Sequence, residues 1–551
     1  MSLGLAERQG DLLDDVNRFC EATLPENSIF AVLHRERDGL FPDEMFADLF
    51  SARGRESVPP SIVSTVMVLQ RLQGLSDREA VEAYAFDARW RYAAGVGGYD
   101  TGGWGRFAHT VLVDMRARLA GSDRPRRIFE VSTQVAGAAG LLGVKRVLDS
   151  APIYDAVATM DTITLIRSAI RGLLKAADGD LEERLRAALS SGDDYAGAGK
   201  PVIDWDDAQA RDELIDSRAK DGFACLAVLE GRQLDEPVAE AAQLLATVLG
   251  QDLEQRDDGG FAIARRVAAD RVISTVDPQA RHGHKTAARG FDGYKGHLAV
   301  DPDSEIIANT TVTAGNAGDA TVAEALINDL LEQHRSNGQS ATAETDTVGT
   351  EATQDERATG GADTPRVYGD NAYGSGGFHD RLEKAGIDDR CKTQQPVAAG
   401  GMFAKDRFAI DLHADRARCP AGHTAPIRRR SNGAGTVSFW PFCTHCPLRQ
   451  QCTTAPDGRT VTVGAYERQL AAARTRQRDP DWITDYRATR PKVERKIAHL
   501  MRRRHGGRRA RMRGREKIAA DFDLLAAAHN LARLAVLGLR ANPTGWAVAA
   551  G

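Results

Sequence analysis

The stretch VKRVLDSAP, residues 144–152, gives the main indication of the fold of this 551-residue chain. Its apolar and β-branched residues predict a buried strand that ends at Asp149, because the serine and proline that follow would stop a central strand. The stretch RVYGD, residues 366–370, repeats the pattern, with a short strand that ends at Asp370 and the glycine-rich turn NAYGSGG behind it. Two strands that each end in a carboxylate predict an α/β core.

Three further stretches between these two predict strands. They are RVISTVD from residue 271, GYKGHLAVD from 293 and EIIANTTVT from 305. Pro-Asp-Ser separates the last two, which predicts an antiparallel hairpin. We therefore expect a mixed five-stranded sheet with helices on both faces.

The N-terminal region contains clear signals for the beginning and end of helices. Pro59 and Pro60 precede one expected helix, Gly74 closes it, and Ser76 with Glu79 forms a capping-box signature for the next. A small helical bundle and a DNA-reading helix-turn-helix both fit this pattern. We take the region as a candidate DNA-binding domain.

The length predicts several folding units, some inserted into others. The almost wholly helical stretch after the first strand has no strand signal strong enough to continue the sheet. The low-complexity stretch 335–364 is too polar to order itself. The expected units are a helical N-terminal domain (1–130), the first part of the α/β core (140–155), a helical insertion (156–270), the second part of the core with a disordered loop at 335–364 (271–395), an insertion with four clustered cysteines (396–484), and a C-terminal helix with a basic segment (485–551).

The composition narrows the class of protein. Apolar residues make up 42% and charged residues 27%, and no apolar run approaches the roughly 20 residues that a bilayer requires, so we expect no membrane span. The N-terminus lacks the layout of an export signal, which predicts a cytoplasmic protein, nucleoid-associated when bound to DNA, with reduced cysteines. The net charge of −5 argues weakly against nucleic acid, yet residues 502–517 hold nine Arg or Lys and one Glu.

Three acidic residues are candidates for a two-metal site, in which bridging carboxylates hold two divalent ions for attack at phosphorus. Asp149 and Asp370 end neighbouring strands, and Glu494 lies at the edge of an apolar helical stripe in RPKVERKIAHLMRRR. Each also has a simpler explanation, as a turn residue or as a carboxylate at a helix N-terminus. On spacing alone, four other acids compete: Asp161, Asp292, Asp301 and Asp319.

A family resemblance favours the first three. The stretches VLDSAPIYDAVATMDT, DGYKGHLAVDPDSEIIANTTVTAGNAGD, RVYGDNAYG and YRATRPKVERKIAHLMRR, followed by GGRRARMRG, resemble insertion-sequence DDE transposases of the insertion sequence eleven-eighty-two group. The resemblance implies a ribonuclease-H-like core with catalytic Asp149, Asp370 and Glu494. The family pattern around the last acid is matched by Tyr486 and Arg490, although their spacing is four residues where related groups often have three.

Four of the seven cysteines lie within one stretch: Cys419, Cys443, Cys446 and Cys452. A C-x2-C pair with two more thiols nearby predicts a tetrahedral structural Zn²⁺ site in a reducing compartment. Free cysteines, replacement of a thiol by His423 or His445, and an iron–sulfur cluster remain alternatives. The isolated cysteines at 20, 225 and 391 are assigned to packing.

Basic residues near the last acid are candidates for DNA contact. Phosphate contact explains a dense run of Arg beside a phosphate-cutting centre better than a solvated face does. The candidate DNA-binding residues are Lys295, Arg490, Arg502, Arg503, Arg508, Arg509, Arg511 and Arg513.

The expected activity is therefore that of a DDE transposase. It would hydrolyse DNA at transposon ends and join the freed 3′-hydroxyl to target DNA, with two Mg²⁺ or Mn²⁺ ions. The expected partners are double-stranded DNA, at terminal inverted repeats and target sites, and a second copy of the chain as a homodimer on DNA. A ribonuclease-H-like nuclease without strand transfer and an inactive, transposase-derived DNA-binding protein are the alternatives.

Overall fold

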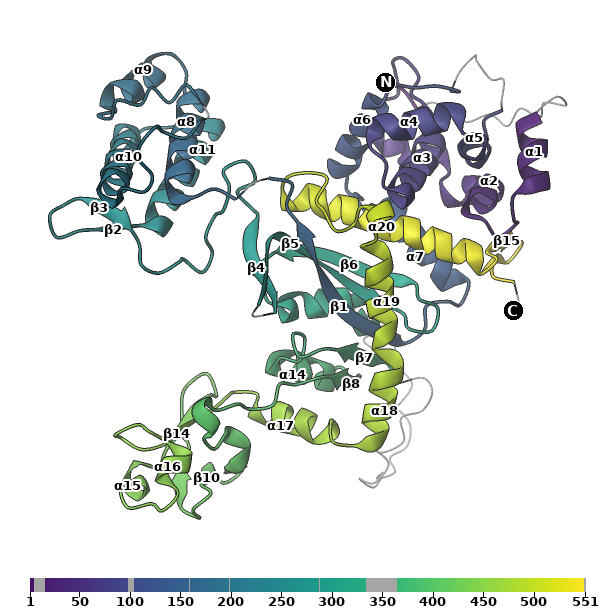
Figure 1. Ribbon diagram of the computed structural model, residues 1–551. Helices are drawn as coiled ribbons and strands as arrows, with labels where there is room; N and C mark the ends of the chain where they lie inside the picture. The colour runs from purple at the N-terminus through teal and green to yellow at the C-terminus, as the bar shows by residue number, and fades with distance from the viewer. Residues whose placement is uncertain are drawn as a thin grey trace, which may run out of the picture.

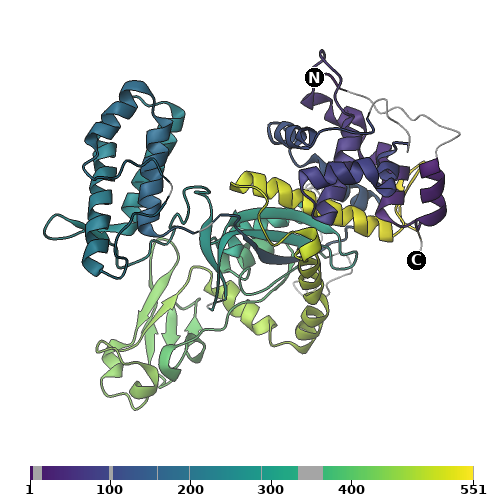
Figure 2. The ribbon, with the colours of Figure 1, turned by 45° about the horizontal axis from the view of Figure 1, so that its top comes forward.

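The chain is organised around one mixed β-sheet (Figure 1). The N-terminal helices lie on one side of this sheet and two insertions project from the other side, as the second view also shows (Figure 2). The predicted disordered loop falls, apart from its last residue, outside the described residues. The computed structural model describes residues 1–3, 15–97, 104–157, 159–197, 199–286, 288–332 and 364–549.

The central sheet is curled and has six strands. Its order is β4-β5-β1-β7-β8, and β6 also pairs with β5. Strand β1 is antiparallel to β5 and parallel to β7, which is parallel to β8. The strands are β1 (Lys145–Tyr154), β4 (Arg281–Thr286), β5 (Arg289–Val300), β6 (Ile307–Ala314), β7 (Arg366–Gly369) and β8 (Asp388–Cys391).

The sixth strand arises because β5 is long enough to pair with two strands along one edge. Strand β4 pairs with its first half and β6 with its second half. The predicted β5–β6 hairpin is confirmed. The prediction of five strands is wrong in two ways. The sequence analysis missed β4, in the polar sequence RHGHKT, and β8, and it included RVISTVD, which is not a strand.

Strand β1 does not end at Asp149 as predicted, but runs on through Pro152 to Tyr154. Its partner β7 pairs only with the first three residues of β1. Beyond Val147 this edge pairs with no further strand among the described residues, and Tyr154 alone forms a bridge there, with Arg509. The missing N–H of Pro152 therefore removes no ladder hydrogen bond. The carboxylate therefore lies in the middle of the strand.

The predicted strand RVISTVD is also wrong, since residues 271–277 form no strand. Val272 and Ile273 are buried and Val276 is exposed, and the backbone of the stretch bonds to the helical insertion. The Val272 N–H donates to Gln251 Oε1 at 2.8 Å, and the Ile273 carbonyl accepts from the Met160 N–H at 2.9 Å. Residues 271–277 therefore form a linker that packs against the helical insertion.

The two faces of the sheet pack against different helices, as the period of two along each strand requires. Val147, Leu298 and Tyr368 belong to the core shared with α19 and α20, whereas Leu148 and Val367 pack beneath α12 and α14. Asp149 alternates with Leu148 and so faces α19. The covering helices are α12 (Ala323–Leu326), after η2 (Asp319–Val322), α14 (Gly376–Lys384), α19 (Pro491–Leu500) and α20 (Arg515–Val536).

The N-terminal helices pack on α20 and share its core. The predicted capping box of Ser76 and Glu79 is confirmed, and Gly74 ends α3 in the left-handed conformation, with φ of 70°. Every residue of α3 from Pro60 to Arg71 is buried, so α3 is a core helix with no face for DNA. The elements are α1 (Asp15–Thr23), α2 (Ile29–Leu40), η1 (Asp43–Leu49), α3 (Pro60–Gln73), α4 (Asp77–Phe86), α5 (Ala88–Ala94), α6 (Thr110–Ala120) and α7 (Arg127–Ala138).

The segment that follows β1 is mostly helical and has its own apolar core. It also contains a short hairpin that the sequence analysis did not predict. Its elements are α8 (Thr162–Ala176), α9 (Gly179–Ala188), α10 (Ala208–Leu229), α11 (Glu236–Asp252), β2 (Leu253–Gln255) and β3 (Phe261–Ile263).

The cysteine-containing segment forms two three-stranded sheets with a separate small core. Its elements are η3 (Ala399–Gly401), η4 (Lys405–Arg407), β9 (Ala409–Asp411), β10 (Arg416–Arg418), β11 (Thr424–Pro426), β12 (Arg428–Arg429), β13 (Gly435–Ser438), α15 (Trp440–Cys443), α16 (Arg449–Cys452) and β14 (Thr460–Val463).

The chain returns to the sheet through consecutive helices and ends in a hairpin beside α2. No helix among the described residues is long and apolar enough to cross a membrane. The remaining elements are α17 (Glu467–Arg476), α18 (Pro480–Thr489), η5 (Arg503–His505), β15 (Arg540–Asn542) and β16 (Gly545–Ala547).

Candidate active site

Asp149 is held in the middle of β1, opposite Leu298 of β5. It is 9% exposed, and its Oδ1 accepts from the Ser150 N–H at 2.8 Å. Burial raises the pKa of this carboxyl above its usual value, although the nearby Arg490 opposes the shift. A buried carboxylate at this position requires a positive partner.

Asp370 follows β7 directly, at the end of the strand that runs parallel to β1. It shapes the turn behind the strand, because its Oδ1 accepts from the Ala372 N–H at 2.9 Å and its carbonyl from the Tyr373 N–H at 3.1 Å. Parallel neighbours point their carboxyl ends the same way, so Asp370 is directed toward the edge where Asp149 lies.

Glu494 lies in the first turn of α19, beside the buried stripe of Val493, Ile497 and Leu500. The stripe packs this helix onto β1, and Glu494 itself is exposed. The packing brings the first turn of α19 over the strand that holds Asp149.

Arg490 joins the three acids. Its guanidinium lies 3.1 Å from Asp149 Oδ1, 3.8 Å from Asp370 Oδ2 and 3.4 Å from Glu494 Oε1. The structure thus brings the three predicted residues around one cation. Sequence analysis assigned Arg490 to DNA; instead it is 6% exposed and faces the acids. The signal for this role was its spacing of four from Glu494, which places both side chains on one helix face.

The charges around Arg490 raise the pKa of its guanidinium. Burial alone would lower it, and Asp149 is the largest opposing influence. Two of its nitrogens, Nε and Nη1, are buried without a hydrogen-bond acceptor among the described residues. The pairing of Arg490 with the acids is therefore mainly electrostatic.

The four competing acids have other partners in the structure. Asp161 caps α8, accepting from the Thr164 N–H at 2.9 Å, and Asp301 accepts from the Ser304 N–H at 2.9 Å in the β5–β6 turn. Asp292 pairs with His282 at 2.7 Å, and Asp319 pairs with Lys295 at 2.9 Å. None of the four has an ion pair with Arg490 among the described residues.

Lys295 therefore lies in a polar network rather than on an open surface. Its Nζ donates to Asp319 Oδ1 and to the Ala317 carbonyl, while Ser150 Oγ donates to the other oxygen of Asp319 at 2.6 Å. Beside it, His297 is fully buried and burial lowers its pKa to about 4. The predicted DNA contact of Lys295 competes with these bonds.

The basic segment is attached to the end of β1. The Tyr154 N–H donates to the Arg508 carbonyl at 2.9 Å, and the Ala510 N–H donates to the Tyr154 carbonyl at 2.8 Å. A cleft of about 980 Å³ opens here. Four of the predicted DNA-binding residues line it: Arg502, Arg503, Arg508 and Arg509.

The other two predicted DNA-binding residues of this segment, Arg511 and Arg513, differ from each other in burial. Arg513 is exposed, whereas Arg511 is half-buried and donates to the Leu75 carbonyl at the turn between α3 and α4. Burial lowers the pKa of Arg511. Arg511 thus joins the N-terminal helices to the basic segment.

The four clustered cysteines line one cavity of about 20 Å³, together with His423. Cys419 sits at the β10–β11 turn, Cys443 ends α15 and Cys452 ends α16. The Arg459 N–H donates to Cys443 Sγ at 3.4 Å, as backbone amides do toward ligating sulfur. Four thiols are a donor set that Zn²⁺ prefers. No three of these sulfurs lie within 4.8 Å of one another, so the segment would have to close around a bound ion.

Two family models match parts of this chain. A transposase DDE domain matches residues 418–535, which include Glu494, the four clustered cysteines and the basic segment. A transposase domain (DUF772) matches residues 18–118, within α1 to α6. No curated protein and no solved structure matches the chain. Together with the mixed sheet, the two matches support a DDE transposase, a kind of enzyme that acts on DNA and uses divalent metal.

Proposed function

We propose that this chain cleaves DNA at the ends of its transposon and joins the freed 3′-hydroxyl to target DNA. Asp149, Asp370 and Glu494 are the catalytic residues. The observation that supports this most is the convergence of the three carboxylates on Arg490. They come from β1, the end of β7 and α19, and lie 3.1, 3.8 and 3.4 Å from the Arg490 guanidinium. The arginine-lined cleft opens farther along β1, at Tyr154.

The acids supply only oxygen donors, which suits Mg²⁺ or Mn²⁺. Two such ions, when bound, would activate the attacking oxygen and stabilise the leaving one. In the protein itself, Arg490 offsets the repulsion among the acids and keeps them together. Ser150 holds Asp149 through its backbone N–H, and the turn after β7 fixes Asp370.

The DNA path of this proposal follows the cleft. The exposed guanidinium groups of Arg502, Arg503, Arg508 and Arg509 provide positive charge next to the end of β1. Phosphate contacts of this kind position a duplex without reading its sequence. The remaining partners are terminal inverted repeats, target DNA and a second copy of the chain bound to the same DNA.

We also propose that Cys419, Cys443, Cys446 and Cys452 bind one structural Zn²⁺. The segment from β9 to β14 has a small core of its own, of a size that gains much of its folding energy from a bound ion. Its role is to order this segment, which lies in the chain between β8 and α17.

One assay tests the proposed activity. The purified chain is incubated with Mg²⁺ and a duplex that contains the DNA flanking its own gene, together with a labelled target duplex. End cleavage followed by a joined product is the expected result. Cleavage with no joined product would identify a nuclease, and binding with neither product would identify an inactive DNA-binding descendant.

A further inference from the structure

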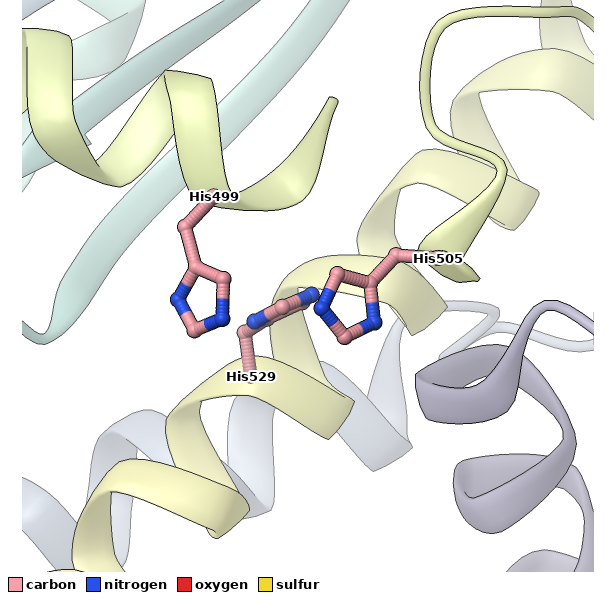
Figure 3. Close-up of side chains that lie close together, drawn as sticks. All are labelled: His499, His505 and His529. Atoms are coloured by element: carbon pink, nitrogen blue, oxygen red, sulfur yellow. The ribbon is translucent and has the colours of Figure 1, made fainter. Parts of the chain in front are cut away.

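Three histidines meet on the other side of α19, away from the carboxylates. His499 comes from α19, His505 from η5 and His529 from α20, and Figure 3 shows their rings turned toward one another. One ring nitrogen of each lies within 4.8 Å of the others. In the part of the chain that is described, no other three possible ligands meet this spacing.

His529 provides the first indication of a ligand. Its side chain is 3% exposed, and its Nε2 has no hydrogen-bond partner among the described residues. A buried ring nitrogen without a protein partner is costly, so His529 Nε2 is suited to bind a ligand. The ring lies 4.5 Å from that of His505 and 5.0 Å from that of His499, centroid to centroid.

His505 provides the second indication. Its Nδ1 faces the Leu72 carbonyl, which fixes this nitrogen as the donor and leaves the lone pair on Nε2. Metal-ligating histidines commonly donate their other ring N–H to a carbonyl in this way. The lone pair of His505 is therefore oriented by the backbone of α3.

A cation already occupies these lone pairs. Arg504 Nε donates to His505 Nε2 at 2.9 Å, and Arg504 Nη2 lies 3.4 Å from His499 Nε2. Arg504 is exposed, so its side chain can leave without breaking the core. The place resembles the carboxylate site, where Arg490 also holds the position of a positive ion.

We propose that His499, His505 and His529 bind one divalent ion that prefers nitrogen ligands, of the Zn²⁺ class, with Arg504 displaced. Imidazole suits such ions, and three histidines with an open fourth position make an established geometry for zinc. Nitrogens around a tetrahedral zinc lie roughly 3.3 Å apart at bonds of about 2.0–2.1 Å, so small ring movements suffice.

Such an ion would hold together the helix of a proposed catalytic acid and the basic segment, and the proposed function requires both. It would bridge α19, which holds Glu494, to η5 at the start of the basic segment, and η5 already contacts α3 through Leu72 and Arg71. A cavity of about 520 Å³ gives solvent access to the three rings. Lys496 and Arg533 line the same cavity and oppose a cation, whereas Glu305 favours one.

The test uses the full chain, stripped with a chelator and titrated with Co²⁺ alone. Cobalt on the cysteines gives a thiolate charge-transfer band in the near ultraviolet, whereas cobalt on three histidines gives visible bands without it. We expect a second equivalent with histidine-type bands. His499→Gln should weaken that equivalent by at least about 100-fold, since even changes to groups behind the ligands cost about 10- to 100-fold.

Two matched variants sharpen the test. His413→Gln replaces an exposed histidine near β9 and should change neither band. Arg504→Ala should tighten the histidine site about tenfold, since it removes the competing cation, a result that a purely structural role for the rings would not give. His499 is only half-buried, so its variant should fold with the wild-type Tm in the absence of metal.

Three results would overturn this proposal. They are a wild-type chain without histidine-type bands, a His499→Gln variant that binds Co²⁺ as the wild type does, and stabilisation of the wild type by phosphate but not by Co²⁺, which would identify an anion pocket. The thiolate band reports the cysteine site separately, and end cleavage in Mg²⁺ reports the proposed function separately. If the cysteine site binds no Co²⁺, or if the chain does not cleave DNA, the histidine-type bands still test this proposal.

Discussion

At the scale of single residues, the site is a balance between three carboxylates and one arginine. Asp149 and Arg490 are both buried, while Glu494 is exposed and reaches Arg490 from the surface. The strongest pairing is therefore between the two buried groups, because solvent screens the exposed one. Two predictions follow from this difference.

Removal of any one acid should stop catalysis, while Arg490 keeps two of its three carboxylate partners. We expect Asp149→Asn, Asp370→Asn and Glu494→Gln each to reduce end cleavage by more than about 100-fold, the upper cost of changes behind a metal ligand. Each variant keeps its volume and should still bind duplex DNA. A gel assay of cleavage and a shift assay of binding check this, and normal cleavage by any variant would remove that residue from the site.

Removal of Arg490 should make stability depend on pH. In Arg490→Met the carboxyl of Asp149 stays buried without its cation, so its folded pKa, already raised by burial, rises further above the unfolded value. The contribution of this carboxyl to stability is then fully present below its unfolded pKa and is lost as the pH rises through its folded pKa. Near neutral pH we expect a loss of about 3 kcal/mol, typical of breaking a buried pair.

Denaturant unfolding at several pH values, with and without Mg²⁺, checks this prediction. Arg495→Met, on the same helix, is the control, because Arg495 is exposed and pairs only at the surface with Glu305 at 3.0 Å. Equal pH profiles for the two variants would show that Arg490 does not hold the acids. Mg²⁺ should restore more stability to Arg490→Met than to the control.

At the scale of elements, the turn between α3 and α4 docks the N-terminal helices onto the C-terminal region. His505 donates to the Leu72 carbonyl, Arg511 donates to the Leu75 carbonyl, and Arg71 pairs with Asp521 at 3.0 Å. Gly74 lies inside this contact with positive φ, and a Cβ there would lie 2.4 Å from the Arg504 carbonyl oxygen. The turn can therefore accept only glycine.

Gly74→Ala should accordingly be more destabilising than a glycine substitution at an open site. Gly231 is the control, because its φ is +71° and nothing lies within 4 Å of an added Cβ. Gly231→Ala should cost about 1 kcal/mol for the left-handed conformation, and Gly74→Ala about 2–4 kcal/mol, because the clash adds to that strain. Thermal unfolding of both compares them; equal losses would mean that the turn does not dock tightly.

The cysteine segment is an element whose order should depend on metal. Cys443→Ser should lose one Zn²⁺ per chain and the order of the segment from β9 to β14, because the ion supplies folding energy to a small core. Elemental analysis and limited proteolysis measure the two effects. Cys225→Ser, at a buried cysteine of the helical insertion, should retain the ion. Iron in place of zinc, or no metal in the wild type, would contradict the assignment.

At the scale of the whole molecule, charge is segregated. The net charge is −5, yet four exposed arginines line the cleft beside the end of β1. A polyanion should therefore meet the protein at one place only. The strength of that contact can be read from its salt dependence.

Neutralising Arg502, Arg503, Arg508 and Arg509 together should weaken binding to matched and unmatched duplexes alike. If all four contact phosphates, the slope of log affinity against log salt should fall by roughly 0.9 per contact, or about three to four in total. The control neutralises four exposed basic residues of the helical insertion, and an equal loss there would place the DNA path elsewhere. They are Arg184, Arg186, Lys220 and Arg232.

The elements that could be predicted from the sequence are those that depend on interactions between neighbouring residues. The apolar run before Asp149, the capping box of Ser76, and the turn between β5 and β6 depend on residues a few positions apart. The strands and helices nearest the proposed site were therefore predictable. The cysteine spacing was readable for the same reason.

The interactions between these strands and helices depend on the tertiary structure. Strand β1 continues through Pro152 because β7 covers just its first residues, and RVISTVD is a linker because the insertion takes its backbone bonds. Arg490 was assigned to DNA because a sequence does not show burial, and burial beside Asp149 makes it a partner of the acids. Strand pairing, burial and charge balance depend on residues far apart in the chain, so they form only when α19 packs on the sheet.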